Sequence, residues 1–286
     1  MRPNYNIKEI ILWIKSELKG HYPSSEIESF VSLIFNHLLN YSRTQLILHN
    51  EYSLSTRTIQ EIEHIILELK QNKPIQYILG NTEFYTMHFN VTPGVLIPRQ
   101  ETEELVDWII NENKKGFHKI LDIGTGSGII AIVLAKNLPG AIVFATDISN
   151  EALTTTRKNC KLNNVDVQIL QHNILNHAND LNETFDLIVS NPPYVTESEK
   201  QYMHPNVLDY EPPVALFVPD SDPLQFYRKI VDFALANLNT NGKLYFEINE
   251  SYGKEVALLL EEKDFSEILL KKDINGKDRM IRAVLK

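Results

Sequence analysis

Three glycines at alternate positions follow an apolar run at residues 119–128, where the chain reads KILDIGTGSG, and a second apolar run, IIAIVLA, begins directly after them. The first run predicts a strand and the second a helix. Glycine has no Cβ, so Gly124, Gly126 and Gly128 let the backbone turn sharply and approach a ligand closely. Open α/β sheets bind their ligands at the carboxyl ends of strands. The segment therefore predicts a strand, turn and helix of such a sheet, with a ligand at the turn.

From residue 119 onward, apolar runs of strand length alternate with helical patterns. Strands are predicted near residues 119–123, 141–146, 166–171, 185–190, 243–248, 265–271 and 279–285. Such alternation indicates a mostly parallel sheet with helices on both faces. Asn275 and Gly276 form a tight-turn signal between the last two strands, so this pair is expected to be antiparallel. The expected fold class is α/β, a doubly wound, seven-stranded, Rossmann-like sheet.

Asp147 closes the second predicted strand about twenty residues after the glycine turn, where a carboxylate can accept hydrogen bonds from ribose hydroxyls. A nicotinamide cofactor fits this arrangement equally well. The glycines, however, are spaced G-x-G-x-G, so the third lies one place early for a pyrophosphate cradle. Asp122, just before the turn, is placed to meet a cationic ligand group. S-adenosylmethionine carries an ammonium and a sulfonium and no phosphate, and the pattern favours it.

Asn191, Pro192, Pro193 and Tyr194 directly follow the predicted strand 185–190. Proline has no N–H and a fixed φ, so it ends the strand and displays carbonyl groups at a rigid turn. The Asn191 side-chain oxygen and the Pro192 carbonyl can accept both hydrogens of a planar amide or amine, with Tyr194 flat against it, which orients the nitrogen for attack. The alternative is a strand that simply stops at two prolines. Together with the glycine turn, the motif indicates methyl transfer to nitrogen.

These motifs resemble the HemK/PrmC family. The resemblance rests on residues 97–103 (IPRQETE), 121–128, 145–149 and 190–194, with further matches at 211–212, 215–216, 247–248 and 273–279. It covers the chain from about residue 74 onward. It implies a class I S-adenosylmethionine-dependent methyltransferase that modifies the side-chain nitrogen (N5) of the glutamine in the Gly-Gly-Gln motif of bacterial class 1 peptide chain release factors.

The resemblance also implies roles for individual residues. The cofactor would be lined by Gly124, Thr125, Gly126, Ser127 and Gly128, with Asp147 on the ribose and Asn173 or Ile174 near the adenine. Asn191 would contact cofactor and substrate, Pro192, Pro193 and Tyr194 would complete the glutamine pocket, and Asn191, Pro192 and Tyr194 would be catalytic. The chain departs from the family pattern at Asn173 (usually Asp), at Asn249 (usually Gly) and at residues 218–222. These departures affect the adenine contact and the geometry of two loops.

The first part of the chain carries apolar residues at helical spacing and predicts a helical bundle over residues 1–73. Residues 74–98 alternate between apolar and polar, which predicts a β-hairpin connector. Residues 99–286 form the predicted methyltransferase domain. The long loop at residues 195–222 begins at the Asn-Pro-Pro-Tyr turn and is expected to form a lip for the substrate. The resemblance assigns the bundle to release-factor binding.

The formal net charge of −9 bears on the substrate. Proteins that hold nucleic acids concentrate lysine and arginine against the phosphates, whereas here basic residues occur together only in pairs, such as Lys114 and Lys115. This favours a protein substrate and no stable nucleic-acid partner. Two alternatives stay open: an N-methyltransferase of an exocyclic amine of DNA or RNA, and a non-catalytic interaction protein that binds S-adenosylmethionine.

The remaining features indicate a cytoplasmic protein. No apolar run approaches the roughly 20 residues of a transmembrane helix, and the first residues lack a signal-peptide pattern. The single cysteine, Cys160, cannot form an intrachain disulfide and is expected to pack in the fold. No Cys or His spacing indicates a metal site. A monomer without a bound metal or a membrane partner is expected.

Overall fold

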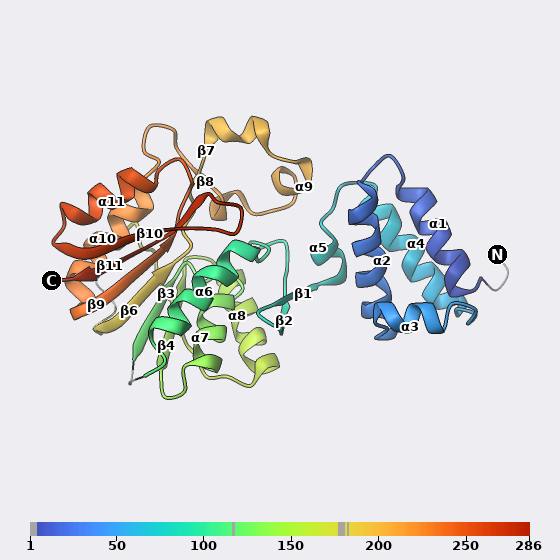
Figure 1. Cartoon of the computed structure of the whole chain (residues 1–286), viewed down its shortest axis with the longest axis horizontal. Coiled ribbons are helices and arrows are strands. Elements are labelled where there is room, and N and C mark those ends of the chain that lie inside the picture. Colours follow the sequence, from blue (N-terminus) through green and yellow to red (C-terminus); the bar gives the residue numbers. More distant parts are fainter. Residues whose placement is uncertain (1–4, 116–117, 177–180, 182) are drawn as a thin grey trace. The chain divides into compact units, whose positions relative to one another are not determined.

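The computed structural model describes residues 5–115, 118–176, 181 and 183–286. The protein consists of two compact units: one extends to Gly80 and includes Pro205–Tyr210, and the other holds Asn81–His204 and Glu211–Lys286. Figure 1 labels the helices and strands of both.

The first unit is helical. Its helices are α1 (Ile7–Leu18), α2 (Ser24–Leu39), α3 (Arg43–Leu48), α4 (Thr56–Leu69), α5 (Ile75–Leu79) and, from the later segment, α9 (Pro205–Leu208). Helix α1 begins at a capping box in which Asn6 and Glu9 each accept the other's backbone N–H. Its Ile10 and Ile14 are buried in one apolar cluster with α2 and α4. The three predicted helical stripes are thus confirmed, whereas α3, which buries Leu46, is a helix that the apolar pattern does not predict.

The prediction of a hairpin connector over residues 74–98 is wrong for its first part. Residues Ile75–Leu79 form α5, which ends at Gly80 in the left-handed conformation. Their apolar side chains lie at helical spacing and pack in the core of the helical unit. The hairpin itself is shorter, with β1 (Asn81–Phe84) antiparallel to β2 (Met87–Asn90). The first unit therefore extends past residue 73, where the sequence placed its end, to Gly80.

The second unit is built on a seven-stranded sheet. Its strands are β3 (Lys119–Ile123), β4 (Ile142–Asp147), β5 (Gln168–Gln171), β6 (Phe185–Ser190), β9 (Leu238–Glu247), β10 (Phe265–Lys272) and β11 (Asp278–Leu285). Their order across the sheet is β10-β11-β9-β6-β3-β4-β5. Strand β11 is antiparallel to both of its neighbours, and the other neighbouring strands are parallel. The predicted α/β sheet with an antiparallel closing pair is confirmed.

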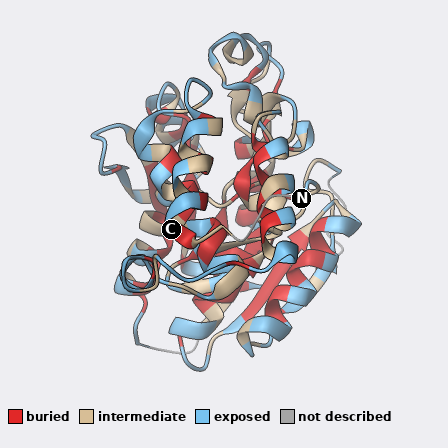
Figure 2. Cartoon of the chain, turned by 90° about the vertical axis from the view of Figure 1, so that its right-hand side faces the viewer, coloured by how far each residue is buried: buried red, intermediate tan, exposed pale blue. Residues whose placement is uncertain are grey.

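Helices cover both faces of this sheet. They are α6 (Gln100–Glu112), α7 (Ile129–Asn137) and α8 (Asn150–Asn163) on one face, and α10 (Gln225–Asn237) and α11 (Gly253–Glu261) on the other. Successive strand residues point to opposite sides, so Ile120 packs with the first group and Leu121 with the second. In Figure 2 buried residues run along the strands and the inward faces of the helices. The central strands β3, β4 and β6 are buried on both sides along most of their length, as parallel strands covered by helices are, whereas the edge strands β5 and β10 are largely exposed.

Glycines shape the turn between β3 and α7. Gly124, Gly126 and Gly128 have φ angles of 74°, 57° and 83°, a region that residues with a Cβ enter only at a cost. The backbone N–H groups of Gly124 and Thr125 donate to the Thr146 carbonyl on β4, both at 2.9 Å. The turn is therefore tied to the neighbouring strand.

A buried carboxylate anchors the same turn. Asp122 is fully buried, and its Oδ2 accepts from the Thr125 hydroxyl at 2.6 Å and from the Ala131 N–H at 3.3 Å. No described group donates to its Oδ1. Burial, which disfavours the charged form, raises the pKa of Asp122 to about 7.

We predict that Gly128→Ala destabilises the protein more than Gly276→Ala. Both positions have positive φ, which costs an alanine about 1–2 kcal/mol. A Cβ at Gly128 would lie 2.6 Å from Thr156 Cγ2, whereas at Gly276 no described atom lies within 4 Å. Overpacking adds about 1–3 kcal/mol at Gly128. Urea denaturation of the two variants checks this, and equal shifts of the midpoint would contradict it.

We also predict that Asp122→Asn changes how stability depends on pH. The folded pKa of about 7 lies above the usual value near 4, so the stabilisation that Asp122 contributes below pH 4 is lost as pH rises toward 7. Asparagine does not titrate. Relative to the variant, the wild type should lose up to about 1.4 kcal/mol per pH unit in this window. Urea denaturation at several pH values gives the difference, and parallel curves would refute the role of burial.

Candidate functional site

A cavity lies at the carboxyl edge of the sheet, where β3, β4 and β6 end beside one another. It is lined by Gly124, Gly126, Asp147, Ile148, Ser149, His172, Asn173, Ile174, Leu175, Ser190, Asn191, Pro192, Pro193, Val214, Ala215 and the segment 94–96. The structure thus brings the glycine turn, the predicted ribose carboxylate and the Asn-Pro-Pro turn to one place. We term it the sheet-edge cavity.

Asp147 holds the turn and faces the cavity at the same time. Its Oδ2 accepts from the Gly126 N–H at 2.9 Å, and its Oδ1 accepts from the Ser149 N–H at 2.9 Å. Burial raises the pKa of Asp147, and these backbone hydrogen bonds oppose the shift. Each carboxylate oxygen has a further lone pair. Asp147 can therefore accept hydrogen bonds from a pair of ligand hydroxyls.

The five residues of the glycine turn divide into two groups. Gly124 and Gly126 line the cavity, whereas Thr125, Ser127 and Gly128 do not. Thr125 is bound to Asp122, and the Ser127 carbonyl accepts from Asn159 Nδ2 at 2.8 Å. Asp122 lies buried beneath the turn and does not line the cavity. Asp122, Thr125, Ser127 and Gly128 therefore support the conformation of the turn without lining the cavity.

The loop after β5 forms the apolar side of the cavity. Ile174 and Leu175 line it together with Ile148, which directly follows β4. The Asn173 side-chain oxygen accepts from the Leu175 N–H at 3.1 Å, a turn that aspartate would form equally well. The departure from the family pattern at Asn173 therefore leaves the loop conformation intact.

The chemistry of the lining suits adenosine without a phosphate. Apolar side chains provide a surface for a flat base, and Asp147 provides acceptors for ribose hydroxyls. Among the described residues that line the cavity, none is a lysine or arginine that could neutralise a pyrophosphate. The residues present thus fit S-adenosylmethionine and fit a dinucleotide poorly.

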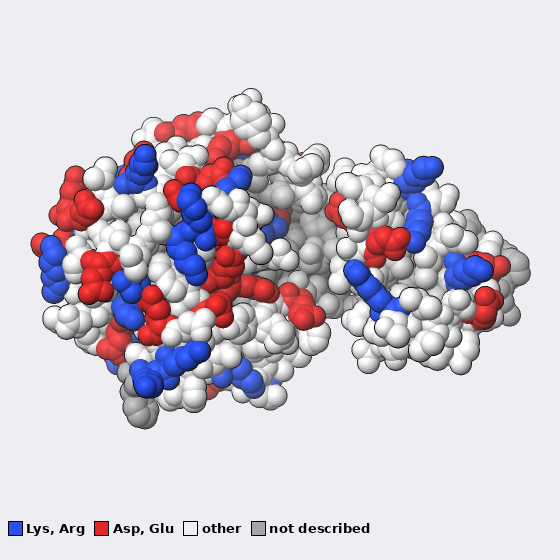
Figure 3. All heavy atoms as spheres, viewed as in Figure 1, with Lys and Arg blue, Asp and Glu red and all other residues white. Residues whose placement is uncertain are grey.

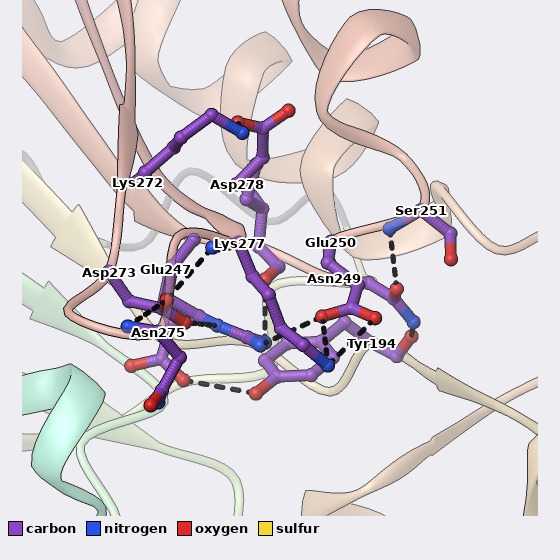
Figure 4. A network of polar contacts seen from close by, with 12 residues as sticks. Tyr194, Glu247, Asn249, Glu250, Ser251, Lys272, Asp273, Asn275, Lys277 and Asp278 are labelled. Atoms are coloured by element: carbon purple, nitrogen blue, oxygen red, sulfur yellow. Dashed lines mark hydrogen bonds and ion pairs between the residues drawn. The ribbon is translucent and has the colours of Figure 1, made fainter.

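The Asn-Pro-Pro-Tyr turn leaves the sheet where β6 ends. Asn191 lines the cavity, and its Nδ2 donates to Thr102 Oγ1 at 3.3 Å. The Thr102 hydroxyl donates to Glu247 Oε2 at 2.6 Å, and the Tyr194 hydroxyl donates to Glu247 Oε1 at 3.0 Å. Figure 4 shows the Tyr194 ring with its hydroxyl directed at the Glu247 carboxylate. Tyr194 does not line the cavity, and in this structure its hydroxyl is engaged with Glu247.

The two titratable groups of this network, Tyr194 and Glu247, both have pKa values above their ordinary ones. Burial, followed by the charge of Glu247, raises the pKa of the Tyr194 hydroxyl. Burial also raises the pKa of Glu247, while hydrogen bonds from Thr102 and Tyr194 and the charge of Arg279 oppose that rise. Tyr194 is therefore a protonated donor, and Glu247 accepts hydrogen bonds from the hydroxyls of Tyr194 and Thr102.

Asn249, the second departure from the family pattern, fixes the backbone of the turn. Its Nδ2 donates to the Tyr194 carbonyl at 3.2 Å and to the Glu199 carboxylate at 3.1 Å, and its Oδ1 accepts from the Ser251 N–H at 2.9 Å. Figure 4 shows Asn249 between Tyr194 and Ser251. Thr102, Glu247 and Asn249 belong to the site, but the sequence showed Thr102 and Glu247 only within matched motifs and Asn249 only as an unusual residue.

The predicted lip at residues 195–222 is an ordered loop. Strand β7 (Val195–Thr196) pairs in parallel with β8 (Phe217–Val218), and the short helices η1 (Glu197–Tyr202) and η2 (Pro213–Ala215) lie between them in the chain. The Glu211 side chain, 1% exposed, accepts from Arg99 Nη2 at 2.6 Å and from the Ile97 N–H at 3.2 Å. This carboxylate pins the loop to the segment before α6. Its role as a substrate lip stays a prediction.

Other features bear on alternative chemistry. Cys160 is buried in the core and burial raises the pKa of its thiol to about 11, which agrees with a packing role. Within the described ranges, no group of three His, Cys, Asp or Glu residues is arranged to hold a metal ion. None of the described helices is long and apolar enough to cross a membrane. On the face shown in Figure 3, basic and acidic side chains are interspersed.

Two family models and several relatives match this chain. The PrmC N-terminal domain matches residues 9–80, and the Methyltransferase small domain matches residues 101–208. A release factor glutamine methyltransferase of Flavobacterium psychrophilum is 53% identical over 93% of this chain and 94% of its own length. One of Bacteroides thetaiotaomicron is 45% identical over 97% of this chain and 99% of its own.

Solved structures share the fold at low identity. A methyltransferase from Pyrococcus furiosus has a TM-score of 0.52 at 18% identity and covers 80% of this chain and 98% of its own. A 16S rRNA methyltransferase of T. thermophilus, in complex with AdoMet and guanosine, has a TM-score of 0.52 at 21% identity and covers 72% of this chain and 50% of its own. These likenesses show the methyltransferase sheet alone. Identity along nearly the full length decides the family, and this chain belongs to the release factor glutamine methyltransferases.

Proposed function

We propose that this protein transfers a methyl group from S-adenosylmethionine to the N5 nitrogen of the glutamine in the Gly-Gly-Gln motif of bacterial class 1 release factors. A pair of unpaired acceptors supports the proposal: no described group donates to Asn191 Oδ1 or to the Pro192 carbonyl. Both residues line the sheet-edge cavity. A side-chain amide has two N–H groups, so the two acceptors match it. Family membership supports glutamine as the bearer of that amide.

Asn191 and Pro192 would act by holding the nitrogen. The amide lone pair is delocalised, so a free glutamine side chain is a poor nucleophile. With both N–H groups bound, one to Asn191 Oδ1 and one to the Pro192 carbonyl, the nitrogen is oriented and immobile. Both acceptors also stabilise the positive charge that develops on the nitrogen. Bound S-adenosylmethionine supplies an electrophilic methyl group on a sulfonium.

No general base is required. The Tyr194 hydroxyl is bound to Glu247 and its raised pKa keeps it protonated, so it would position the turn and would not remove a proton. A nitrogen that has gained a methyl group is acidic, and its surplus proton can pass to water. Positioning in a water-poor site carries the step.

The cofactor would lie against the turns after β3, β4 and β5. Gly124 and Gly126 would allow close backbone approach, and Asp147 would bind the ribose hydroxyls. Asn173 and Ile174 would lie near the adenine. Thr125, Ser127 and Gly128 would contribute by shaping the turn, which refines the roles that the resemblance implies.

The helical first unit would bind the release factor. The match of the PrmC N-terminal domain to residues 9–80 supports this role. The net charge of −9 and the interspersed charges on the face shown in Figure 3 support a protein substrate and no stable nucleic-acid partner. We further propose that the protein works as a monomer in the cytoplasm.

The substrate class is tested with methyl-labelled S-adenosylmethionine. The protein is incubated separately with a bacterial class 1 release factor, with DNA and with RNA. Label on the release-factor glutamine, found by mass spectrometry, supports the proposal. Label on DNA or RNA would replace it with the exocyclic-amine reading, and cofactor binding with no labelled substrate would favour a non-catalytic protein.

We predict that Asn191→Ala loses turnover and keeps its cofactor. The substitution removes one of the two acceptors, so kcat should fall about 100-fold or more. The dissociation constant for S-adenosylmethionine, measured by calorimetry, should stay within about threefold because the cofactor contacts lie mainly on other turns. A kcat near that of the wild type would refute the role of Asn191.

We also predict that removal of residues 1–80 impairs methylation of the intact release factor. The cut at Gly80 follows the boundary of the helical unit and removes α5 with it. The release-factor KM should rise by at least about tenfold. Unchanged cofactor affinity provides the control for folding of the remaining unit. Undiminished methylation of the release factor would show that the helical unit does not grip it.

A further inference from the structure

We propose that Thr102 and Glu247 are positioning residues that fix which end of the Asn191 amide faces the substrate. This inference rests on the proposed function, because it concerns the acceptor for the substrate N–H. The amide of asparagine has a donor end and an acceptor end of nearly the same shape. Only the acceptor end can bind the substrate nitrogen's hydrogen. The site must therefore contain something that selects one of the two orientations.

The single hydroxyl proton of Thr102 selects the orientation of the Asn191 amide. The Thr102 hydroxyl has one proton, and it is given to Glu247 Oε2 at 2.6 Å. The Thr102 oxygen can then only accept, and it accepts from Asn191 Nδ2 at 3.3 Å. In the opposite orientation, Asn191 Oδ1 would face the lone pairs of Thr102 with no proton between them. The correct orientation leaves Oδ1 unpaired at the cavity.

Glu247 sets the direction of the chain of hydrogen bonds. A carboxylate is an acceptor at both oxygens, and here Oε1 accepts from Tyr194 and Oε2 from Thr102. Both Thr102 and Glu247 are 1% exposed, so water does not compete for these protons. The charged and titratable groups that act on Glu247 include Tyr194, Tyr227, Arg279 and Glu101. The proton order runs one way, from Asn191 through Thr102 to Glu247.

Three separate elements bring these groups together. Asn191 follows β6, Glu247 ends the adjacent strand β9, and Thr102 lies in the first turn of α6. Ser190 on β6 pairs with Phe246 on β9, so Asn191 and Glu247 follow a matched pair. Thr102 spans the distance between them. A hydroxyl at this position is thus a relay between two strand ends.

The first test compares Thr102→Val with Thr102→Ser. Valine keeps the shape and removes the relay, so kcat for release-factor methylation should fall about 10- to 100-fold. Serine restores a hydroxyl and should keep kcat within about threefold of the wild type. Thr155→Val, a change of the same kind at a buried threonine on α8, should leave kcat unaltered. The affinity for S-adenosylmethionine should be the same in all three variants, because neither Thr102 nor Thr155 lines the sheet-edge cavity.

A double substitution separates orientation from general damage. If Thr102 acts only through Asn191, Asn191→Ala with Thr102→Val should be no slower than Asn191→Ala alone. Glu247→Gln should lower kcat in the same manner, because one oxygen then serves two donors. Losses that multiply in the double variant, or a Thr102→Val enzyme with wild-type kcat, would overturn the inference.

A readout without catalysis keeps the inference distinct from the proposed function. The side-chain amide of Asn191 gives a nitrogen-15 NMR signal, which is assigned by its loss in Asn191→Ala. In the wild type and in Thr102→Ser, one amide hydrogen is bound to the hydroxyl and should exchange slowly with water. In Thr102→Val it should shift and exchange faster. An unchanged signal in Thr102→Val would contradict the role of Thr102 in orienting Asn191. A wild type that fails to label the release factor would contradict only the proposed function.

Discussion

The parallel register of three neighbouring strands is the constraint on which the site depends. Ile123 of β3 pairs with Thr146 of β4 and with Ser190 of β6, so three distant chain segments leave the sheet at one level. Both faces of these strands are buried, and a slip of one residue would turn every apolar side chain to the wrong face. The register is thus held by the whole core. The glycine turn, Asp147 and Asn191 meet because the core permits no other alignment.

Features that repeat along the chain could be predicted from the sequence. Apolar runs and turn signals located the seven strands and the antiparallel closing pair, since each of these patterns lies within a few consecutive residues. The same reasoning failed at residues 75–79, where a five-residue helix and an alternating pattern look alike. These residues form a helix because their apolar side chains are buried in the helical core, and such burial depends on the whole fold and cannot be seen in a short stretch of sequence. The short helix α3 was not predicted either, because its six residues are too few to establish a helical period.

The candidate site divides in a similar way. Gly124, Gly126, Asp147 and Asn191 could be found because their residue types and positions at strand ends carry the chemistry. Thr102 could not be found in this way, because its role depends on hydrogen bonds with Asn191, 89 residues away, and with Glu247, 145 residues away. No spacing rule links such positions. Tyr194 was expected against the substrate, which stays a prediction, and the motif alone could not show that its hydroxyl donates to the buried Glu247.

The position of β11 has a consequence for how the protein is made. This strand follows all the others in the chain, yet it lies inside the sheet, between β9 and β10. Its Arg279 carbonyl accepts from the Ile248 N–H at 2.9 Å, directly beyond the end of β9 where Glu247 stands. During synthesis the ribosome therefore delivers β9 long before its partner, and β9 keeps an open edge in the meantime. An enzyme placed in a family that acts on release factors can complete its own site only after β11 has been translated.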